Sequence, residues 1–179
     1  MEWNGLAIPG DGCFRDAWRF LQKFAEVSKT NYLNVLALRF DVPVRAFLDE
    51  VESVMKDDPG AQGLVARLAP CEDVFTFTDP PDFDVRARDA VLARADDVAG
   101  RSFHVRVHRR GFKKDFDRLA REKRLGEALW HAAVARGTPS KIAYDDAEVV
   151  VAIETIDGRA GLSVWTRADL VKYPLLRPD

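Results

Sequence analysis

The chain has 179 residues, of which 47% are hydrophobic and 31% charged, and its formal net charge at pH 7 is −2. This composition is typical of soluble globular proteins and excludes a disordered chain. No apolar run approaches the roughly 20 residues that span a bilayer, and residues 1–10 lack the features of a signal peptide. Two cysteines, Cys13 and Cys71, cannot form a disulfide framework. We therefore expect a cytoplasmic protein with no membrane partner.

Charge is unevenly distributed along this nearly neutral chain. Residues 41–100 contain 6 basic and 14 acidic side chains, whereas residues 101–140 contain 11 basic and 4 acidic ones. A strongly basic segment indicates an anionic partner, although the two segments can instead face each other and cancel. The acidic segment is a candidate surface for a protein partner.

The first 78 residues predict alternating strands and helices. Phe14, Trp18, Leu21 and Phe24 recur at helical spacing, and Asn31 is expected to end that helix. Strands are expected at 3–8, at 32–40 and, as one or two short pieces, between 64 and 78, with a second helix from residue 43 to about 55. This β-α-β-α-β order is typical of a small α+β layer structure.

The sequence Asp79-Pro80-Pro81-Asp82 predicts a linker, because neither a helix interior nor a central strand holds two adjacent prolines. It divides the chain into domains 1–78 and 79–179. Beyond it we expect helices at about 84–98 and 125–136, and a strand at 102–108 that continues to about Arg110. The wholly apolar residues 149–153 predict a central strand, and Asp157-Gly158 predicts the turn into a returning strand at 162–166.

One glycine-containing loop is a candidate nucleotide site. Gly10-Asp11-Gly12 lies between a strand and a helix, where it can hold a phosphate, and Cys13 beside it can act as a thiolate. The loop lacks the Gly-Lys-Ser/Thr ending of a P-loop and the third glycine of a dinucleotide motif. A small enzyme that acts on a nucleotide through Gly10–Gly12 and Cys13 stays open as an alternative.

The three histidines do not indicate a metal site. His104 and His108 lie four residues apart on one strand, about 13 Å at ~3.3 Å per residue, which is too far to share a zinc ion. His131 has no Cys or His at metal-ligand spacing, and no Ser-His-Asp pattern is present. We therefore expect no metal, no cofactor and no catalytic residue, and predict that the protein is not an enzyme.

The basic segment combines charge with geometry. Alternation in strand 102–108 places Phe103, Val105 and Val107 on one face, and the opposite, polar face carries His104, Arg106, His108 and Arg110. The further cations of the segment are Arg109, Lys113, Lys114, Arg118, Arg121, Lys123 and Arg124, with Phe112 and Phe116 between them. A strand end that runs into a basic turn and a helix start suits a phosphate backbone. For residues 121–124, a solvated helix face paired with nearby acids is the alternative.

The stretch from Ser102 to Pro178 resembles a THUMP domain, the RNA-binding module attached to many RNA-modifying enzymes. The motifs that carry the resemblance are FHVRVHRRG at residues 103–111, DDAEVVVAIE at 145–154, DGRAGLSV at 157–164 and Tyr173-Pro174. The resemblance implies an α/β fold of the α+β type, in which a ferredoxin-like N-terminal domain precedes the THUMP domain. The strand and helix order expected for the first 78 residues fits that arrangement.

Within this family the chain is similar to stand-alone adaptors that help an acetyltransferase make acetylcytidine in tRNA and that have no catalytic domain. The resemblance implies a non-catalytic protein that binds tRNA or another structured RNA, with a separate RNA-modifying enzyme as partner and no binding to DNA. The candidate RNA-binding residues are Arg106, His108, Arg109, Arg110, Lys113, Lys114, Arg118 and Arg159. A protein-interaction module that does not bind RNA stays open as a second alternative.

Overall fold

A computed structural model describes residues 2–178 and divides them into two compact units. Within these residues, unit 1 comprises residues 2–72 together with Lys172–Arg177, and unit 2 comprises Asp73–Val171 together with Pro178. The units divide between Glu72 and Asp73 rather than between residues 78 and 79, because residues 73–76 form a strand that pairs within unit 2. In the described part of the chain, no helix has the length and apolar character needed to cross a membrane.

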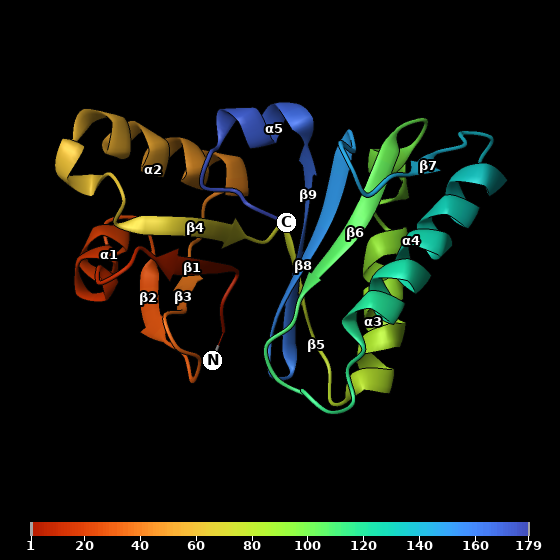
Figure 1. Ribbon diagram of the computed structural model, residues 1–179, viewed down its shortest axis with the longest axis horizontal. Helices are drawn as coiled ribbons and strands as arrows, with labels where there is room; N and C mark the ends of the chain where they lie inside the picture. Colours follow the sequence, from red (N-terminus) through yellow and green to blue (C-terminus); the bar gives the residue numbers. More distant parts are fainter. Residues whose placement is uncertain (1, 179) are drawn as a thin grey trace. The chain divides into compact units, whose positions relative to one another are not determined.

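Unit 1 is a four-stranded antiparallel sheet with two helices (Figure 1). Its elements are β1 (Gly5–Pro9), α1 (Phe14–Leu21), β2 (Glu26–Lys29), β3 (Leu36–Arg39), α2 (Val44–Asp57) and β4 (Val65–Pro70). The strand order is β2-β3-β1-β4, so each β-α-β connection skips over one intervening strand. This is the split β-α-β arrangement of a ferredoxin-like domain, and the predicted fold of the N-terminal part is confirmed.

Two details of unit 1 differ from the sequence prediction. The first helix ends at Leu21 instead of continuing to Asn31, and residues 26–29 form the edge strand β2 against β3. β2 is short and largely exposed, with Val27 as its one apolar residue, so it lacks the alternation that marks a half-buried strand. The predicted strand 32–40 is also shorter, because β3 begins at Leu36 and Leu33 is 98% exposed.

Unit 2 is a five-stranded sheet with the strand order β5-β9-β8-β6-β7. Its elements are β5 (Asp73–Thr76), α3 (Pro80–Leu92), a 3-10 turn at Ala95–Val98, β6 (Ser102–His108), α4 (Arg118–Ala135), β7 (Lys141–Ile142), β8 (Val149–Ile156), β9 (Arg159–Thr166) and α5 (Arg167–Lys172). β6 runs parallel to β7 and β8, whereas β9 is antiparallel to β5 and β8. The predicted central strand and its hairpin partner are confirmed, and β8 is buried along its whole length.

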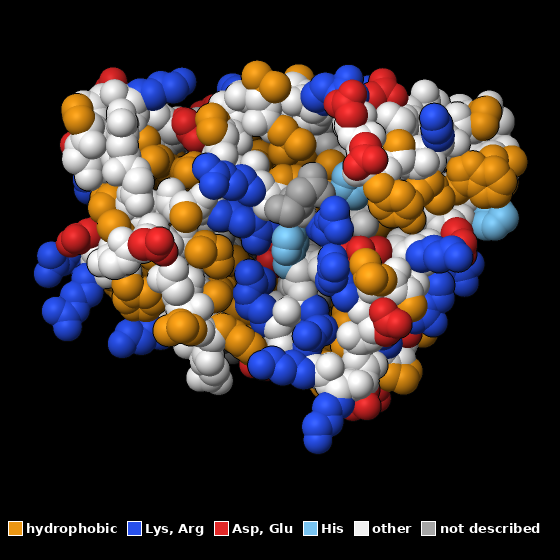
Figure 2. All heavy atoms as spheres, in the orientation of Figure 1, with side chains coloured by type: hydrophobic (Ala, Val, Ile, Leu, Met, Phe, Trp, Pro, Cys, Tyr) orange, Lys and Arg blue, Asp and Glu red, His pale blue; other side chains and the backbone are white. Residues whose placement is uncertain are grey.

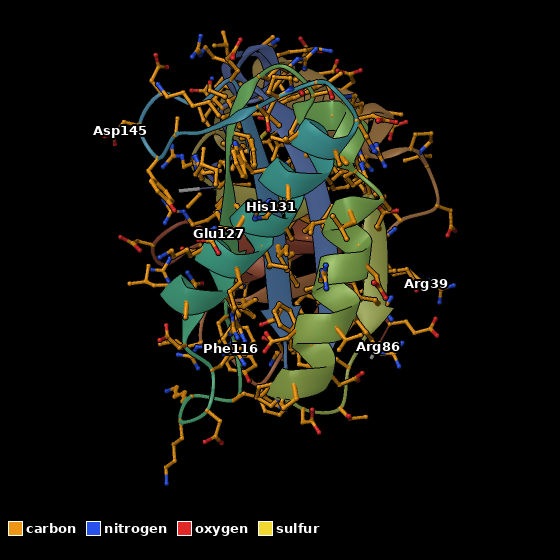
Figure 3. All side chains as sticks on the ribbon, turned by 90° about the vertical axis from the view of Figure 1, so that its right-hand side faces the viewer. Arg39, Arg86, Phe116, Glu127, His131 and Asp145 are labelled. Atoms are coloured by element: carbon orange, nitrogen blue, oxygen red, sulfur yellow. The ribbon has the colours of Figure 1, made fainter. Side chains whose placement is uncertain are left out.

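The helices α3 and α4 lie side by side over one face of this sheet (Figures 1 and 3). Phe103, Val105 and Val107 of β6 point toward them and join the main hydrophobic core of the unit. The alternation predicted for residues 102–108 is therefore real. Because the apolar residues of β6 face the helices, His104, Arg106 and His108 lie on the opposite face of the strand.

The predicted linker at Asp79–Asp82 is wrong. Pro80 and Pro81 occupy the first turn of α3, where the missing proline N–H groups need no partner within the helix. The Asp79 carboxylate accepts a hydrogen bond from the Asp82 N–H at 2.8 Å and so caps the helix. The Thr78 N–H donates to the Asp82 carboxylate at 3.0 Å, and this bond, with Arg86 beside it, holds the pKa of Asp82 below its usual range.

Residues 172–177 return to unit 1. The Leu68 N–H donates to the Leu175 carbonyl at 2.9 Å, and Leu68 and Leu176 form a parallel bridge. Arg67 donates from Nε to the Arg177 carbonyl at 2.6 Å. The segment therefore lies along β4, and residues from both ends of the sequence complete the same unit.

Candidate nucleic-acid interface

The predicted basic site lies where β6 ends and a loop leads to α4. Gly111 (φ 101°) and Phe112 (φ 49°) adopt left-handed backbone conformations, which turn the chain sharply after the strand. The Phe112 ring lies 5.6 Å from that of Phe77, and the Phe116 ring lies 4.9 Å from that of Phe83. These two phenylalanines pack against the hydrophobic core and so hold the loop at both sides.

Four of the predicted residues line one hollow of about 400 Å³ at the end of β6. They are His108, Arg109, Arg110 and Arg118, and Val107 and Phe116 complete the lining. Lys113 and Lys114 are exposed on the adjoining loop. Figure 2 shows Lys and Arg side chains gathered over the lower end of β6 and the loop that follows. The fold therefore brings a strand end, a loop and a helix start together, as the sequence predicted.

The remaining two predicted residues lie close to this hollow in the structure but do not line it. Arg106 is on β6, half-buried, with its guanidinium 3.8 Å from the Glu122 carboxylate. Arg159 begins β9, just after the turn in which the Asp157 N–H donates to the Arg110 carbonyl at 2.9 Å. The polar face of β6 is less exposed than its alternation suggests, because His104 is only 2% exposed and its Nδ1 lies 3.1 Å from the Ala143 carbonyl oxygen.

Two buried acids that the sequence prediction did not assign to the site hold its arginines. Glu122, 5% exposed, accepts hydrogen bonds from the Val107 N–H at 2.8 Å and from Arg118 Nη1 at 2.9 Å. Glu154, 2% exposed, accepts one from Arg110 Nη1 at 2.7 Å, and its other oxygen lies 3.8 Å from His108 Nε2. Arg110 thus has an acidic partner far away in sequence, whereas the nearest acid in sequence is Asp115.

Three cations of the site have no acidic partner among residues 2–178. Arg109 donates from Nη1 to the Gly111 carbonyl at 2.7 Å, which leaves its other N–H groups available. Lys113 and Lys114 are exposed, and no carboxylate of the described chain pairs with either side chain. The loop thus carries uncompensated positive charge next to arginines that are already oriented. Such an arrangement is chemically suited to a phosphate group.

The glycine loop of unit 1 offers less to a phosphate than its sequence suggests. The Gly10 N–H donates to the Leu64 carbonyl at 2.8 Å, and the Cys13 N–H donates to the Gly10 carbonyl at 2.9 Å. Both donors are used inside the protein, so they are not directed at a ligand. Within residues 2–178, no group of three or more His, Cys, Asp or Glu side chains is arranged to hold a metal ion.

Comparison with known proteins gives matches by structure only. No protein-family model matches the chain, and no curated protein matches it by sequence. PH1313 from Pyrococcus horikoshii Ot3 is similar to this chain with a TM-score of 0.57 and 13% identity, over 91% of this chain and 55% of that one. TrmN from Thermus thermophilus is similar with a TM-score of 0.56 and 22% identity, over 89% of this chain and 44% of that one.

A third similar structure is a 4-thiouridine synthetase–RNA complex with bound ATP, which has a TM-score of 0.50 and 10% identity over 92% of this chain and 42% of that one. The chain has the THUMP fold. A ferredoxin-like unit followed by a THUMP unit covers nearly all of its length, in agreement with the fold predicted from the motifs at residues 102–178. The chain spans about half the length of these three proteins, at 55%, 44% and 42%.

Proposed function

We propose that this protein binds structured RNA, tRNA above all, through the hollow at the end of β6 and the loop that follows it. The observation that carries the proposal is the convergence of His108, Arg109, Arg110 and Arg118 on one hollow, beside exposed lysines that have no acidic partner among residues 2–178. Oriented guanidinium groups and point charges at a strand end are what a phosphate backbone requires. A structural neighbour solved as an RNA complex supports the same ligand class.

We further propose that the protein is a non-catalytic adaptor that presents tRNA to a separate RNA-modifying enzyme, and that this enzyme is an acetyltransferase. This part of the proposal rests on the resemblance of residues 102–178 to the THUMP modules of such adaptors. The purified chain, incubated with tRNA and with acetyl-CoA, ATP or S-adenosylmethionine, should then produce no new nucleoside. A modified nucleoside detected by liquid chromatography in that reaction would overturn the adaptor role.

The RNA-binding test requires variants that leave the fold intact. Arg110 is a poor choice for charge reversal, because its side chain is only 16% exposed and bonds to the buried Glu154. Reversal there would leave two carboxylates facing each other in the interior. Lys113 and Lys114 are exposed and make no ion pair with residues 2–178, so Lys113→Glu/Lys114→Glu changes the charge of the site without removing a structural contact.

Binding is measured by fluorescence anisotropy of labelled tRNA across a salt series. We expect Lys113→Glu/Lys114→Glu to weaken binding about tenfold or more, and to reduce the magnitude of the log–log salt slope by about 1.4 to 1.8, the value for two lost phosphate contacts. The matched control is Lys56→Glu/Lys141→Glu, which makes the same charge change on α2 and on β7, beside the opposite end of β6. Equal affinities for the two folded double variants would refute the assigned interface. A folded wild type that binds no tRNA would favour a protein-interaction module.

A further inference from the structure

Buried acids are unexpected in a site for a polyanion, because each one lowers its positive charge. Glu122 and Glu154 nevertheless bond to two of the arginines that line the hollow. We infer that Glu122 and Glu154 are positioning residues for RNA binding, which fix the guanidinium groups of Arg118 and Arg110 toward the RNA phosphates. This inference rests on the proposed function of the site.

Glu122 ties the start of α4 to the end of β6. One carboxylate oxygen accepts both the Val107 N–H of the strand and Nη1 of Arg118, which lies one helical turn before Glu122. The backbone bond fixes the carboxylate, and the fixed carboxylate restricts the Arg118 side chain. The second oxygen lies 3.8 Å from Arg106 Nη1, so the same acid also faces the neighbouring arginine.

Glu154 has the corresponding role for Arg110. It stands opposite His108 in the parallel register of β6 and β8, and one oxygen accepts Arg110 Nη1 at 2.7 Å. The Arg110 backbone is fixed as well, because its N–H donates to Thr155 Oγ1 at 3.0 Å and its carbonyl accepts the Asp157 N–H at 2.9 Å. Arg110 is therefore held at its backbone and at its guanidinium before any ligand arrives.

This preorganisation has a measurable consequence for affinity. Immobilising a flexible side chain on binding weakens affinity by about 2- to 12-fold per side chain, and a side chain that is already fixed avoids this loss. A guanidinium has five N–H donors, so one bond to a buried acid leaves several that can reach a phosphate. If the acids served the fold alone, folded variants lacking their charge would bind RNA as well as wild type or better, because the site would be more positive.

The test compares three substitutions that each remove one negative charge. Glu122→Gln and Glu154→Gln keep the side-chain shape, and the amide carbonyl introduced by Glu122→Gln can still accept the Val107 N–H. Asp115→Asn neutralises an exposed acid on the same loop. We expect tRNA affinity to fall about 2- to 12-fold in each glutamate variant and to rise in Asp115→Asn. The magnitude of the salt slope should stay near the wild-type value in the glutamate variants, because the same arginines still neutralise phosphates and only the cost of ordering them is added.

Circular dichroism and thermal melting show which variants are folded, and either glutamate variant suffices if the other unfolds. If both variants unfold, a measurement on the wild-type protein replaces them: NMR should show restricted rotation of the Arg110 and Arg118 guanidinium groups, with the exposed Arg88 as the reference. Free rotation of both groups would overturn the inference, as would affinities in the folded glutamate variants that equal or exceed that of wild type. If Lys113→Glu/Lys114→Glu weakens binding in the same assay, such a result refutes the positioning role and leaves the proposed function intact. If that double variant also binds normally, the assigned interface fails.

Discussion

The Tyr173 hydroxyl donates a 2.8 Å hydrogen bond to the carboxylate of Asp49, across 124 positions in the sequence. Tyr173 belongs to the segment that returns to unit 1, and its ring is buried there. The Lys172 ammonium also lies 2.8 Å from the same carboxylate. Bonds from Lys172 and Tyr173 hold the pKa of Asp49 below its usual range. The contact joins α2 to the C-terminal segment.

The first prediction concerns this contact. Tyr173→Ala should destabilise the protein by about 3–5 kcal/mol, because it removes a buried aromatic ring. Tyr173→Phe should cost less, since only the hydroxyl bond is lost. Because the folded-state pKa of Asp49 is lowered, its contribution is present above the ordinary aspartate pKa and is lost as the pH falls through the lowered value. The stability difference between Tyr173→Phe and wild type, from urea denaturation, should therefore shrink toward acid pH. A difference that stays constant down to about pH 2 would contradict this account.

The second prediction contrasts two glycines. A Cβ on Gly10 would overlap the carbonyl oxygen of Gly63, so Gly10→Ala should destabilise the protein or prevent its folding. A Cβ on Gly126, inside α4, would meet Ile142 Cδ1 at an ordinary 3.7 Å. Gly126→Ala should therefore stabilise the protein by about 0.5–1 kcal/mol through helix propensity. Thermal melting measures the effect of each substitution. Equal changes in melting temperature for the two variants would show that the space around each glycine does not decide whether alanine is tolerated.

The third prediction concerns the start of α3. Asp79→Ala removes the side chain that caps this helix and should cost about 0.5–2 kcal/mol. Asp79→Asn, which keeps a capping oxygen, should cost much less and serves as the control. Chemical denaturation measures both changes. If the two substitutions were equally harmful, the hydrogen bond from the Asp82 N–H would not be the source of the stabilisation.

The fourth prediction concerns proteolysis. The segment Thr78–Phe83 is capped at Asp79 and opens α3, so it should resist early cleavage by proteinase K, a protease that does not require lysine or arginine. Lys113 and Lys114 lie exposed in an irregular loop and should be the first sites cut by trypsin. Bound tRNA should protect them if the proposed interface is correct. Mass spectrometry of the earliest fragments identifies the first cut. A first tryptic cleavage outside this loop would contradict its predicted accessibility, and a lack of protection by tRNA would contradict the proposed interface.

Local patterns predicted most of this fold. The alternation in residues 102–108, the apolar run 149–153 and the Asp157-Gly158 turn are each strong enough to identify a strand or hairpin without tertiary context. β2 carries no such pattern and forms because β3 offers it an edge. Pro80 and Pro81 misled because adjacent prolines suit a helix start as well as a linker.

The candidate interface was predictable in its cations but not in its acids. Positive charge concentrated around one strand end is visible in sequence, and the fold brings His108, Arg109, Arg110 and Arg118 to one hollow. Glu154 lies 44 residues from Arg110, so no local pattern pairs them. A signal for Glu154 existed nonetheless, because an ionisable residue at the end of a wholly apolar central strand needs a charged partner.

The return of residues 172–177 to unit 1 favours folding of unit 2 before unit 1 is complete. Unit 2 is inserted between two segments that unit 1 needs, so unit 1 must close a loop formed by residues 73–171. Closing a flexible loop of this length costs about 4 kcal/mol in chain entropy beyond a constant. Once unit 2 is folded, the two ends of that loop are held in place, so closing it costs much less chain entropy. During synthesis, unit 2 can therefore fold first, and the edge of the unit 1 sheet along β4 is completed only after residues 172–177 have left the ribosome.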